Sequence, residues 1–134
     1  MSLDIAKAVA HALAKAHPMF DRATCGYCAR AVREALIAGG APLPASGPSA
    51  CNYGPILEKL GFVADLPGRK VGDIAVFEAY PGNPYGHIQI WCGEYWVSDF
   101  IQRRPGVFPA ERQIWPGPIY ERLKVKHKFY RWLP

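Results

Sequence analysis

Hydrophobic side chains in the first half of the chain recur at the spacing of α-helices. Residues 2–16 place Leu, Ile, Val and Ala on one side of a predicted amphipathic helix. A second helix is predicted to start near Thr24 and to end at the Gly-Gly pair that follows Ala38. Residues 41–50 are rich in Pro, Ser and Ala and predict a loop, after which YGPILEKL at 53–60 predicts a short third helix.

The second half of the chain changes to the alternating pattern of β-strands. Strands are predicted at 72–80, 87–92, 95–101 and 120–133. The turn residues Gly93 and Glu94 predict a hairpin between the second and third of these strands. A Pro-rich loop is expected at 102–118, and the last strand alternates apolar side chains with lysines.

The order of these elements favours one fold class. Helices come first, and strands joined by short turns come later, which differs from the alternating helices and strands of a parallel sheet. We therefore expect an α+β fold with N-terminal helices packed on an antiparallel sheet. A chain of 134 residues is long enough for one domain with a substantial core, so residues 1–134 are predicted to form a single domain.

Composition indicates where the protein is made and whether it spans a membrane. Half of the residues are hydrophobic, but no apolar run approaches the roughly 18 residues that span a membrane. Charged and polar residues interrupt the Ala-rich N-terminus, which lacks the unbroken apolar segment of a signal peptide. We expect a protein that is made in the cytoplasm without a signal peptide and has no membrane span.

The positive charge is concentrated near the C-terminus. Residues 1–102 hold eight Lys and Arg against nine Asp and Glu, whereas residues 103–134 hold eight against two. A basic segment of this kind suits an anionic partner, and it is equally typical of a strand edge protected by lysines. No helix-turn-helix, zinc-finger or RNA-binding signature accompanies it, so no nucleic-acid partner is expected.

The spacing of the cysteines allows three chemistries. Cys25 and Cys28 form a C-x-x-C motif at the start of a predicted helix, while Cys51 and Cys92 stand alone and are expected to be small buried side chains. A redox dithiol normally follows a strand, but here a helix and a loop precede the motif. A structural zinc site needs four ligands, usually in two close pairs, and no second pair is present. The third chemistry is that of a nucleophilic cysteine, which needs a histidine as proton acceptor.

His87 is the best candidate for that acceptor because it opens a strand directly after Gly86, at a loop exit. A third group must fix the imidazole tautomer, and Asp99 on the next strand is the candidate. A three-residue hairpin loop would place Asp99 opposite His87, whereas a two-residue loop would place Phe100 there instead. The sequence leaves this register open.

Four motifs carry a resemblance to a known family. They are CARAVR starting at Cys28, GDIAVF, GHIQIW around His87, and WVSDF around Asp99. Together they resemble the NlpC/CHAP group of papain-like cysteine peptidases, and more narrowly the amidase effectors that bacteria inject into rivals through type VI secretion. The resemblance covers roughly residues 20–102.

The resemblance implies a papain-like fold in which Cys28 is the nucleophile, His87 the base and Asp99 the polar third residue, with no metal and no cofactor. The helix N-terminus and His87 would favour the Cys28 thiolate, and the first helical N–H groups would stabilise an oxyanion. The pattern does not explain Cys25.

The implied reaction is hydrolysis of an amide bond in the stem peptides or cross-links of peptidoglycan. The implied setting is the periplasm of a target cell, and a cognate immunity protein is a further expected partner. Papain-like folds also host acyltransferases and deamidases with the same Cys-His pair, so these activities stay open. A C-x-x-C dithiol or zinc module stays open as well.

Overall fold

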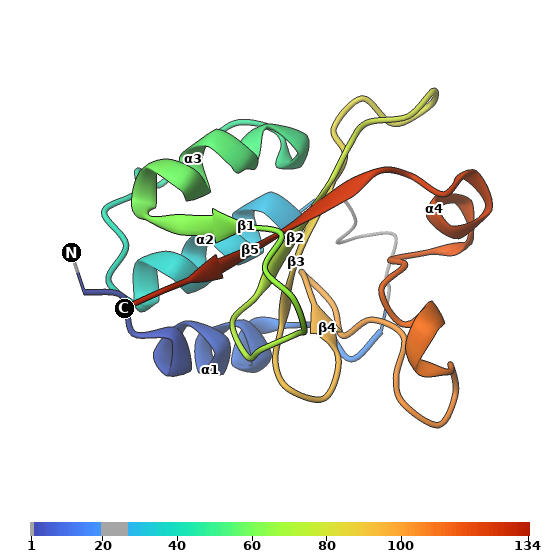
Figure 1. Cartoon of the computed structure of the whole chain (residues 1–134), viewed down its shortest axis with the longest axis horizontal. Coiled ribbons are helices and arrows are strands. Elements are labelled where there is room, and N and C mark those ends of the chain that lie inside the picture. The colour runs from blue at the N-terminus through green and yellow to red at the C-terminus, as the bar shows by residue number, and fades with distance from the viewer. Residues whose placement is uncertain (1, 20–26) are drawn as a thin grey trace.

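The computed structural model describes residues 2–19 and 27–134. Its helices are α1 (Ile5–Lys15), α2 (Cys28–Ala38), α3 (Tyr53–Leu60) and α4 (Pro118–Leu123), with short 3₁₀ turns at Ala50–Asn52 and Ala110–Arg112 (Figure 1). Its strands are β1 (Phe62–Ala64), β2 (Ile74–Phe77), β3 (His87–Trp91), β4 (Trp96–Val97) and β5 (His127–Trp132). The strands form one sheet in the order β1-β5-β2-β3-β4, and every pair is antiparallel. The predicted α+β fold, with helices packed on an antiparallel sheet, is confirmed.

The first two helices begin and end for local reasons. The side chain of Asp4 caps α1 by accepting a hydrogen bond from the backbone N–H of Lys7 at 2.9 Å. The second helix ends where Gly39 donates its N–H to the carbonyl oxygen of Ala35. It begins at Cys28, later than predicted, and the predicted start near Thr24 lies outside the described residues.

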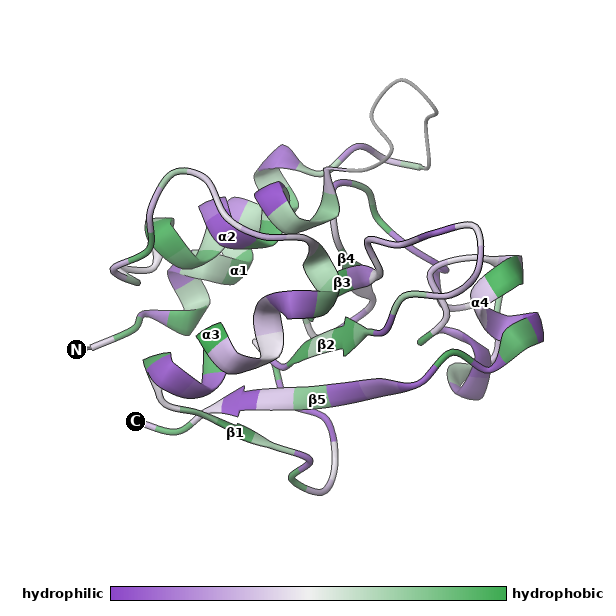
Figure 2. Ribbon diagram, turned by 90° about the horizontal axis from the view of Figure 1, so that it is seen from above, coloured by the Kyte–Doolittle hydropathy of each residue, from purple (hydrophilic) through white to green (hydrophobic). Residues whose placement is uncertain are grey.

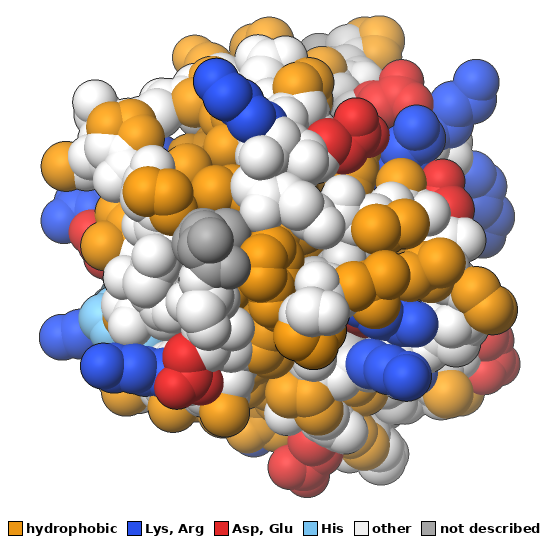
Figure 3. Space-filling view, turned by 60° about the vertical axis from the view of Figure 1, so that its left-hand side comes forward, with side chains coloured by type: hydrophobic (Ala, Val, Ile, Leu, Met, Phe, Trp, Pro, Cys, Tyr) orange, Lys and Arg blue, Asp and Glu red, His pale blue; other side chains and the backbone are white. Residues whose placement is uncertain are grey.

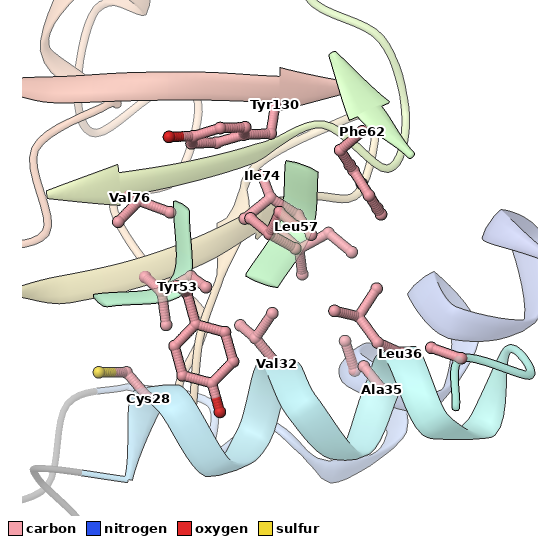
Figure 4. Close-up of a cluster of buried hydrophobic side chains, with 14 of the residues drawn as sticks. Cys28, Val32, Ala35, Leu36, Tyr53, Leu57, Phe62, Ile74, Val76 and Tyr130 are labelled. Atoms are coloured by element: carbon pink, nitrogen blue, oxygen red, sulfur yellow. The ribbon is translucent and has the colours of Figure 1, made fainter. Parts of the chain in front are cut away.

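Helices α1, α2 and α3 lie on one side of the sheet, where they bury the main core (Figure 2). Val32, Ala35 and Leu36 project from α2 toward the sheet, where they meet Leu57 and Ile74 (Figure 4). All five side chains are at most 1% exposed. This apolar face fixes α2 against the sheet and thereby fixes the position of its first residue.

The other face of the sheet carries a second core. It contains Ala75, Phe77, Trp91, Trp96 and Val125. The chain between β4 and β5, including α4, lies on this side (Figure 1). The sheet is therefore buried on both faces, and its central strands β2 and β3 are buried at every position.

The structure adds one strand that was not predicted and corrects the bounds of two that were. Strand β1 was not predicted, because its partner β5 lies at the far end of the chain and no local signal announces the pairing. Strand β4 ends at Val97, well before residue 101. The first residues of the predicted strand 120–133 belong to α4, which starts at Pro118 and ends at Leu123, where Lys124 caps it with a left-handed φ of 50°.

Part of the basic C-terminal segment is neutralised within the fold. Arg131 forms an ion pair with the buried carboxylate of Asp73 at 2.8 Å. Glu121 accepts hydrogen bonds from Arg112 at 2.7 Å and from Arg103 at 2.9 Å, which lower its pKa to about 2. Charged side chains of both signs are interleaved on the face that Figure 3 shows. None of the helices in the described part of the chain has the length and apolar character needed to cross a membrane.

Candidate active site

A cleft of about 800 Å³ opens where α2 and β3 both begin. Its lining includes Cys28 from the start of α2, His87 from the start of β3 and Asp99 from the turn after β4. Tyr120 of α4 lies on the cleft as well, so the C-terminal segment contributes to it. The structure thus brings all three predicted residues to one cavity.

Cys28 is the first residue of α2 and only 9% of its surface is exposed. Figure 4 shows its sulfur at the edge of the core, turned away from Val32. Burial raises the pKa of the thiol to about 11, against the lowering effect of hydrogen bonds from the backbone of Ile88 and Ala29. In the free protein, burial therefore opposes the thiolate that the helix N-terminus was expected to favour.

His87 is held at the start of β3 by a glycine with a special conformation. Gly86 has a φ of 68°, and a side chain there would collide with the carbonyl oxygen of Phe77 and with Cys51. The His87 ring is 7% exposed, and this burial lowers its pKa to about 4, although hydrogen bonding to Gln102 and the charge of Asp99 oppose the shift. Burial thus favours the neutral form of both the Cys28 thiol and the His87 imidazole.

A chain of buried amides fixes which ring nitrogen of His87 carries the proton. Gln89 donates through Nε2 to the backbone carbonyl of Ile114 at 2.9 Å, and this carbonyl can only accept. The Oε1 atom of Gln89 then accepts from Nε2 of Gln102 at 2.8 Å. The Oε1 atom of Gln102 lies 2.8 Å from Nε2 of His87. Since that oxygen can only accept, Nε2 carries the hydrogen and Nδ1 is left as the proton acceptor of the ring.

Asp99 reaches the cleft by a route that strand pairing did not predict. Strand β3 pairs with β4 in the register Trp91 opposite Trp96, which corresponds to the two-residue loop and excludes the register that puts Asp99 opposite His87. The chain then turns after Val97 and folds back along β4.

The backbone of His17, just after α1, secures this turn. Its N–H donates to the carbonyl of Asp99 at 2.9 Å, and its own carbonyl accepts from Ile101 at 2.8 Å. The Asp99 side chain is 8% exposed, and its Oδ2 atom has no hydrogen-bond partner among the described residues. Asp99 thus contributes an uncompensated carboxylate oxygen next to the cleft.

Two solved structures resemble this chain along nearly its whole length. The first is the crystal structure of the type VI native effector-immunity complex Tae3-Tai3 from Ralstonia pickettii, at 33% identity over 97% of this chain and 99% of that chain, with a TM-score of 0.81. The second is the selenomethionine form of the same complex, at 34% identity over 93% and 99%, with a TM-score of 0.77. The chain belongs to the Tae3 family of type VI effectors. No family model and no curated protein sequence matches it.

Membership of the Tae3 family confirms the type VI effector part of the sequence resemblance. It extends the match beyond residue 102, since the C-terminal segment that no motif covered is part of the shared fold. That segment supplies Tyr120, whose hydroxyl accepts from Asn83 at 2.9 Å and donates to the carbonyl of Gly86 at 3.2 Å. These bonds tie α4 to the residue that precedes His87.

Sequence reasoning missed Gln89 and Gln102. A signal existed for Gln89, because alternation along β3 puts it on the same face as His87 in a strand that is otherwise apolar. No local signal existed for Gln102, which reaches His87 only because the chain folds back after Val97.

The other cysteines take no part in the amide chain. Cys51 and Cys92 are half-buried free thiols, and Cys25 lies outside the described residues. Within ranges 2–19 and 27–134, no group of three or more His, Cys, Asp and Glu side chains has a metal-binding arrangement.

Proposed function

We propose that this Tae3-family effector is an antibacterial peptidoglycan amidase, a cysteine hydrolase that cleaves an amide bond in stem peptides or cross-links. The observation that carries the proposal is the cleft shared by Cys28, at the start of a helix, and His87, whose Nε2–H is fixed by Gln102. A nucleophile beside a base that is itself oriented by a third group is the arrangement that acyl transfer requires.

The reaction proceeds from the neutral pair. The Cys28 thiol gives its proton to Nδ1 of His87 while Sγ forms a bond to the carbonyl carbon of the scissile amide. The N–H groups at the start of α2 stabilise the negative charge on the carbonyl oxygen. His87 passes the proton to the leaving nitrogen, and a thioester remains on Cys28. Water then attacks the thioester with His87 as base, which releases a carboxylate and restores the thiol.

Asp99 has an electrostatic role in this proposal. The ring of His87 is positive while it holds the proton, and the charge of Asp99 raises its pKa. The hydrogen bond to the ring comes from Gln102, so Asp99 no longer needs to select the tautomer. In this proposal Gln102 fixes the tautomer of His87, and Asp99 keeps only the electrostatic role.

The biological setting follows the same proposal. The similar structures are effector-immunity complexes, and we extend that pairing to this chain by proposing a cognate immunity protein. The site of action would be the periplasm of the target cell, where peptide stems of peptidoglycan are accessible. An NlpC/CHAP-type papain-like mechanism is part of the proposal.

The test is digestion of purified peptidoglycan, with mass spectrometry of the soluble fragments and measurement of new amino groups. The wild-type protein should release peptide fragments with a new amine, and Cys28→Ala should release none. Cys92→Ala is the matched control because Cys92 is a half-buried thiol outside the cleft. Fragments joined to an added acyl acceptor, with no free carboxylate, would instead indicate an acyltransferase.

A further inference from the structure

One wall of the cleft contains a buried arginine without an acidic partner. Arg33 of α2 is 7% exposed and lines the cleft. Its Nε donates to the carbonyl of Ala45 at 3.2 Å, and its Nη1 donates to the hydroxyl of Tyr53. Both acceptors are neutral, and no Asp or Glu of the described ranges forms an ion pair with Arg33. A buried guanidinium without a counter-charge is unfavourable unless a ligand supplies one.

The neighbouring Arg30 differs from Arg33 in both exposure and pairing. Arg30 lies on the same wall but is exposed, and it forms an ion pair with Glu34 at 3.0 Å. Its charge is already compensated. Arg33, in contrast, keeps its Nη2 group free of hydrogen bonds to the described part of the chain. Of these two arginines, the buried Arg33 is therefore the one without an acidic partner.

Gly47 packs directly against the guanidinium of Arg33. A Cβ atom at this position would lie 2.9 Å from Nη1 of Arg33 and 2.6 Å from the hydroxyl oxygen of Tyr53, which is too close for a side chain to fit. Gly47 is absent from the residues with positive φ, so close packing and not backbone conformation requires glycine here. Gly47 also lines the cleft, so this close contact holds Arg33 in the cleft wall.

Tyr53 holds the guanidinium of Arg33 in place. Its hydroxyl points down toward α2 (Figure 4) and accepts a hydrogen bond from Arg33. Tyr53 is 1% exposed and is not among the residues that line the cleft, so Arg33 is the donor that a ligand in the cleft can reach. A guanidinium held in this way, with Nη2 free, is suited to a carboxylate ligand.

We infer that Arg33, held by Tyr53 and packed against Gly47, binds a carboxylate of the substrate. The inference rests on the proposed function and defines its substrate class as peptides with a free carboxylate near the cleaved bond. Arg33 follows Cys28 by five positions on α2, or about 7.5 Å along the helix axis at 1.5 Å per residue. An extended peptide covers roughly 3.5 Å per residue, so a carboxylate within a few residues of the scissile amide can reach Arg33.

The alternative role for Arg33 is purely structural, because its bond to Ala45 also holds the loop 41–50 on α2. The two roles differ in what they predict for the substrate. A structural role affects all substrates equally. A binding role affects only substrates that carry the carboxylate, and its effect appears mainly in KM.

The experiment compares kcat/KM for a matched set of cross-linked peptides. One peptide has all carboxylates free, and in the others each side-chain or terminal carboxylate is converted in turn to a carboxamide. Wild-type protein should cleave the fully free peptide about tenfold to a hundredfold better than one of the amidated peptides, as expected for a hydrogen-bonded ion pair. Arg33→Gln should remove this preference, and Tyr53→Phe should reduce it. Arg30→Gln is the matched control and should retain it.

If Arg33→Gln does not fold, Gly47→Ala provides the second variant, since its methyl group would collide with Nη1 of Arg33, displace the guanidinium and lower the preference. Equal cleavage of all peptides by the wild type would overturn the carboxylate site and leave the amidase proposal intact. Equal loss of activity on all peptides in Arg33→Gln would assign Arg33 a structural role and also overturn it. Cleavage of these peptides by Cys28→Ala at the wild-type rate would instead overturn the proposed function.

Discussion

The cleft is built from two kinds of structure. Cys28 and His87 each begin a regular element, and both are positioned by the core that buries α2 and β3. Asp99 and Gln102 lie in and just after an irregular turn, which is held by backbone bonds to His17 and Trp96. The reacting groups thus depend on regular elements, whereas the groups that tune them depend on tertiary contacts. Substitutions at the two regions should therefore have effects of different size.

The largest loss of activity is expected on substitution of His87. His87→Ala should lower kcat/KM by roughly 10²–10⁴-fold, because it removes the proton acceptor for the thiol. The rate of peptide release from purified peptidoglycan measures this effect. His11→Ala and His127→Ala are the controls and should keep near-normal rates. Comparable losses in those variants would place the base outside the cleft.

The buried neutral ring of His87 should also make folding stability depend on pH. Its pKa is about 4 in the folded state against an ordinary value of 6.5, so the unfolded chain binds a proton first as pH falls. The stabilising contribution is complete above pH 6.5 and is lost progressively toward pH 4, by about 3 kcal/mol in total. Urea unfolding across this range should show a steeper loss for the wild type than for His87→Ala. Parallel curves would mean that the ring is not buried in its neutral form.

Gln102 tests the tuning region directly. Gln102→Leu should remove the acceptor that holds Nε2–H of His87 and lower kcat by about tenfold to a hundredfold. Gln102→Glu keeps an acceptor and adds a negative charge, so it should raise the pKa of His87 and shift the pH–rate profile to higher pH. A general packing defect would leave the profile of Gln102→Glu unshifted.

The smallest effect is expected at Asp99. Asp99→Asn keeps the shape of the side chain but removes the charge that favours protonated His87, so turnover should fall by roughly tenfold. The melting temperature should change little, because Oδ2 has no partner to lose among the described residues. A loss larger than that of Gln102→Leu would show that Asp99, and not the amide chain, is the main orienting group.

The same contrast explains how much the sequence could predict. The helix at the C-x-x-C motif and the strand that His87 opens followed from local patterns, whereas the choice of Cys28 came from the resemblance of CARAVR to the family motif. The register beyond Val97 is set by contacts with His17 and Trp96, which no local pattern reveals. For the same reason Gln102 was missed and the register that decides the place of Asp99 was left open.

The fold shows the same division between local and distant signals. The first three helices and the central strands were predicted, with errors at their ends. Strand β1 escaped prediction because it pairs with the C-terminal strand β5. Helix α4 escaped it because its six residues continue directly into an alternating strand, so that the alternation was extended too far toward the N-terminus.

The central claim is that Cys28 cleaves an amide by hydrolysis, and digestion of peptidoglycan in heavy-oxygen water tests it most directly. Wild-type protein should release fragments whose newly formed carboxylate contains one heavy oxygen atom, since water resolves the thioester. Cys25→Ala should give the same labelled fragments, and Cys28→Ala should give none. Labelled fragments from Cys28→Ala, or unlabelled fragments from the wild type, would contradict the assignment of Cys28 as the nucleophile of a hydrolase.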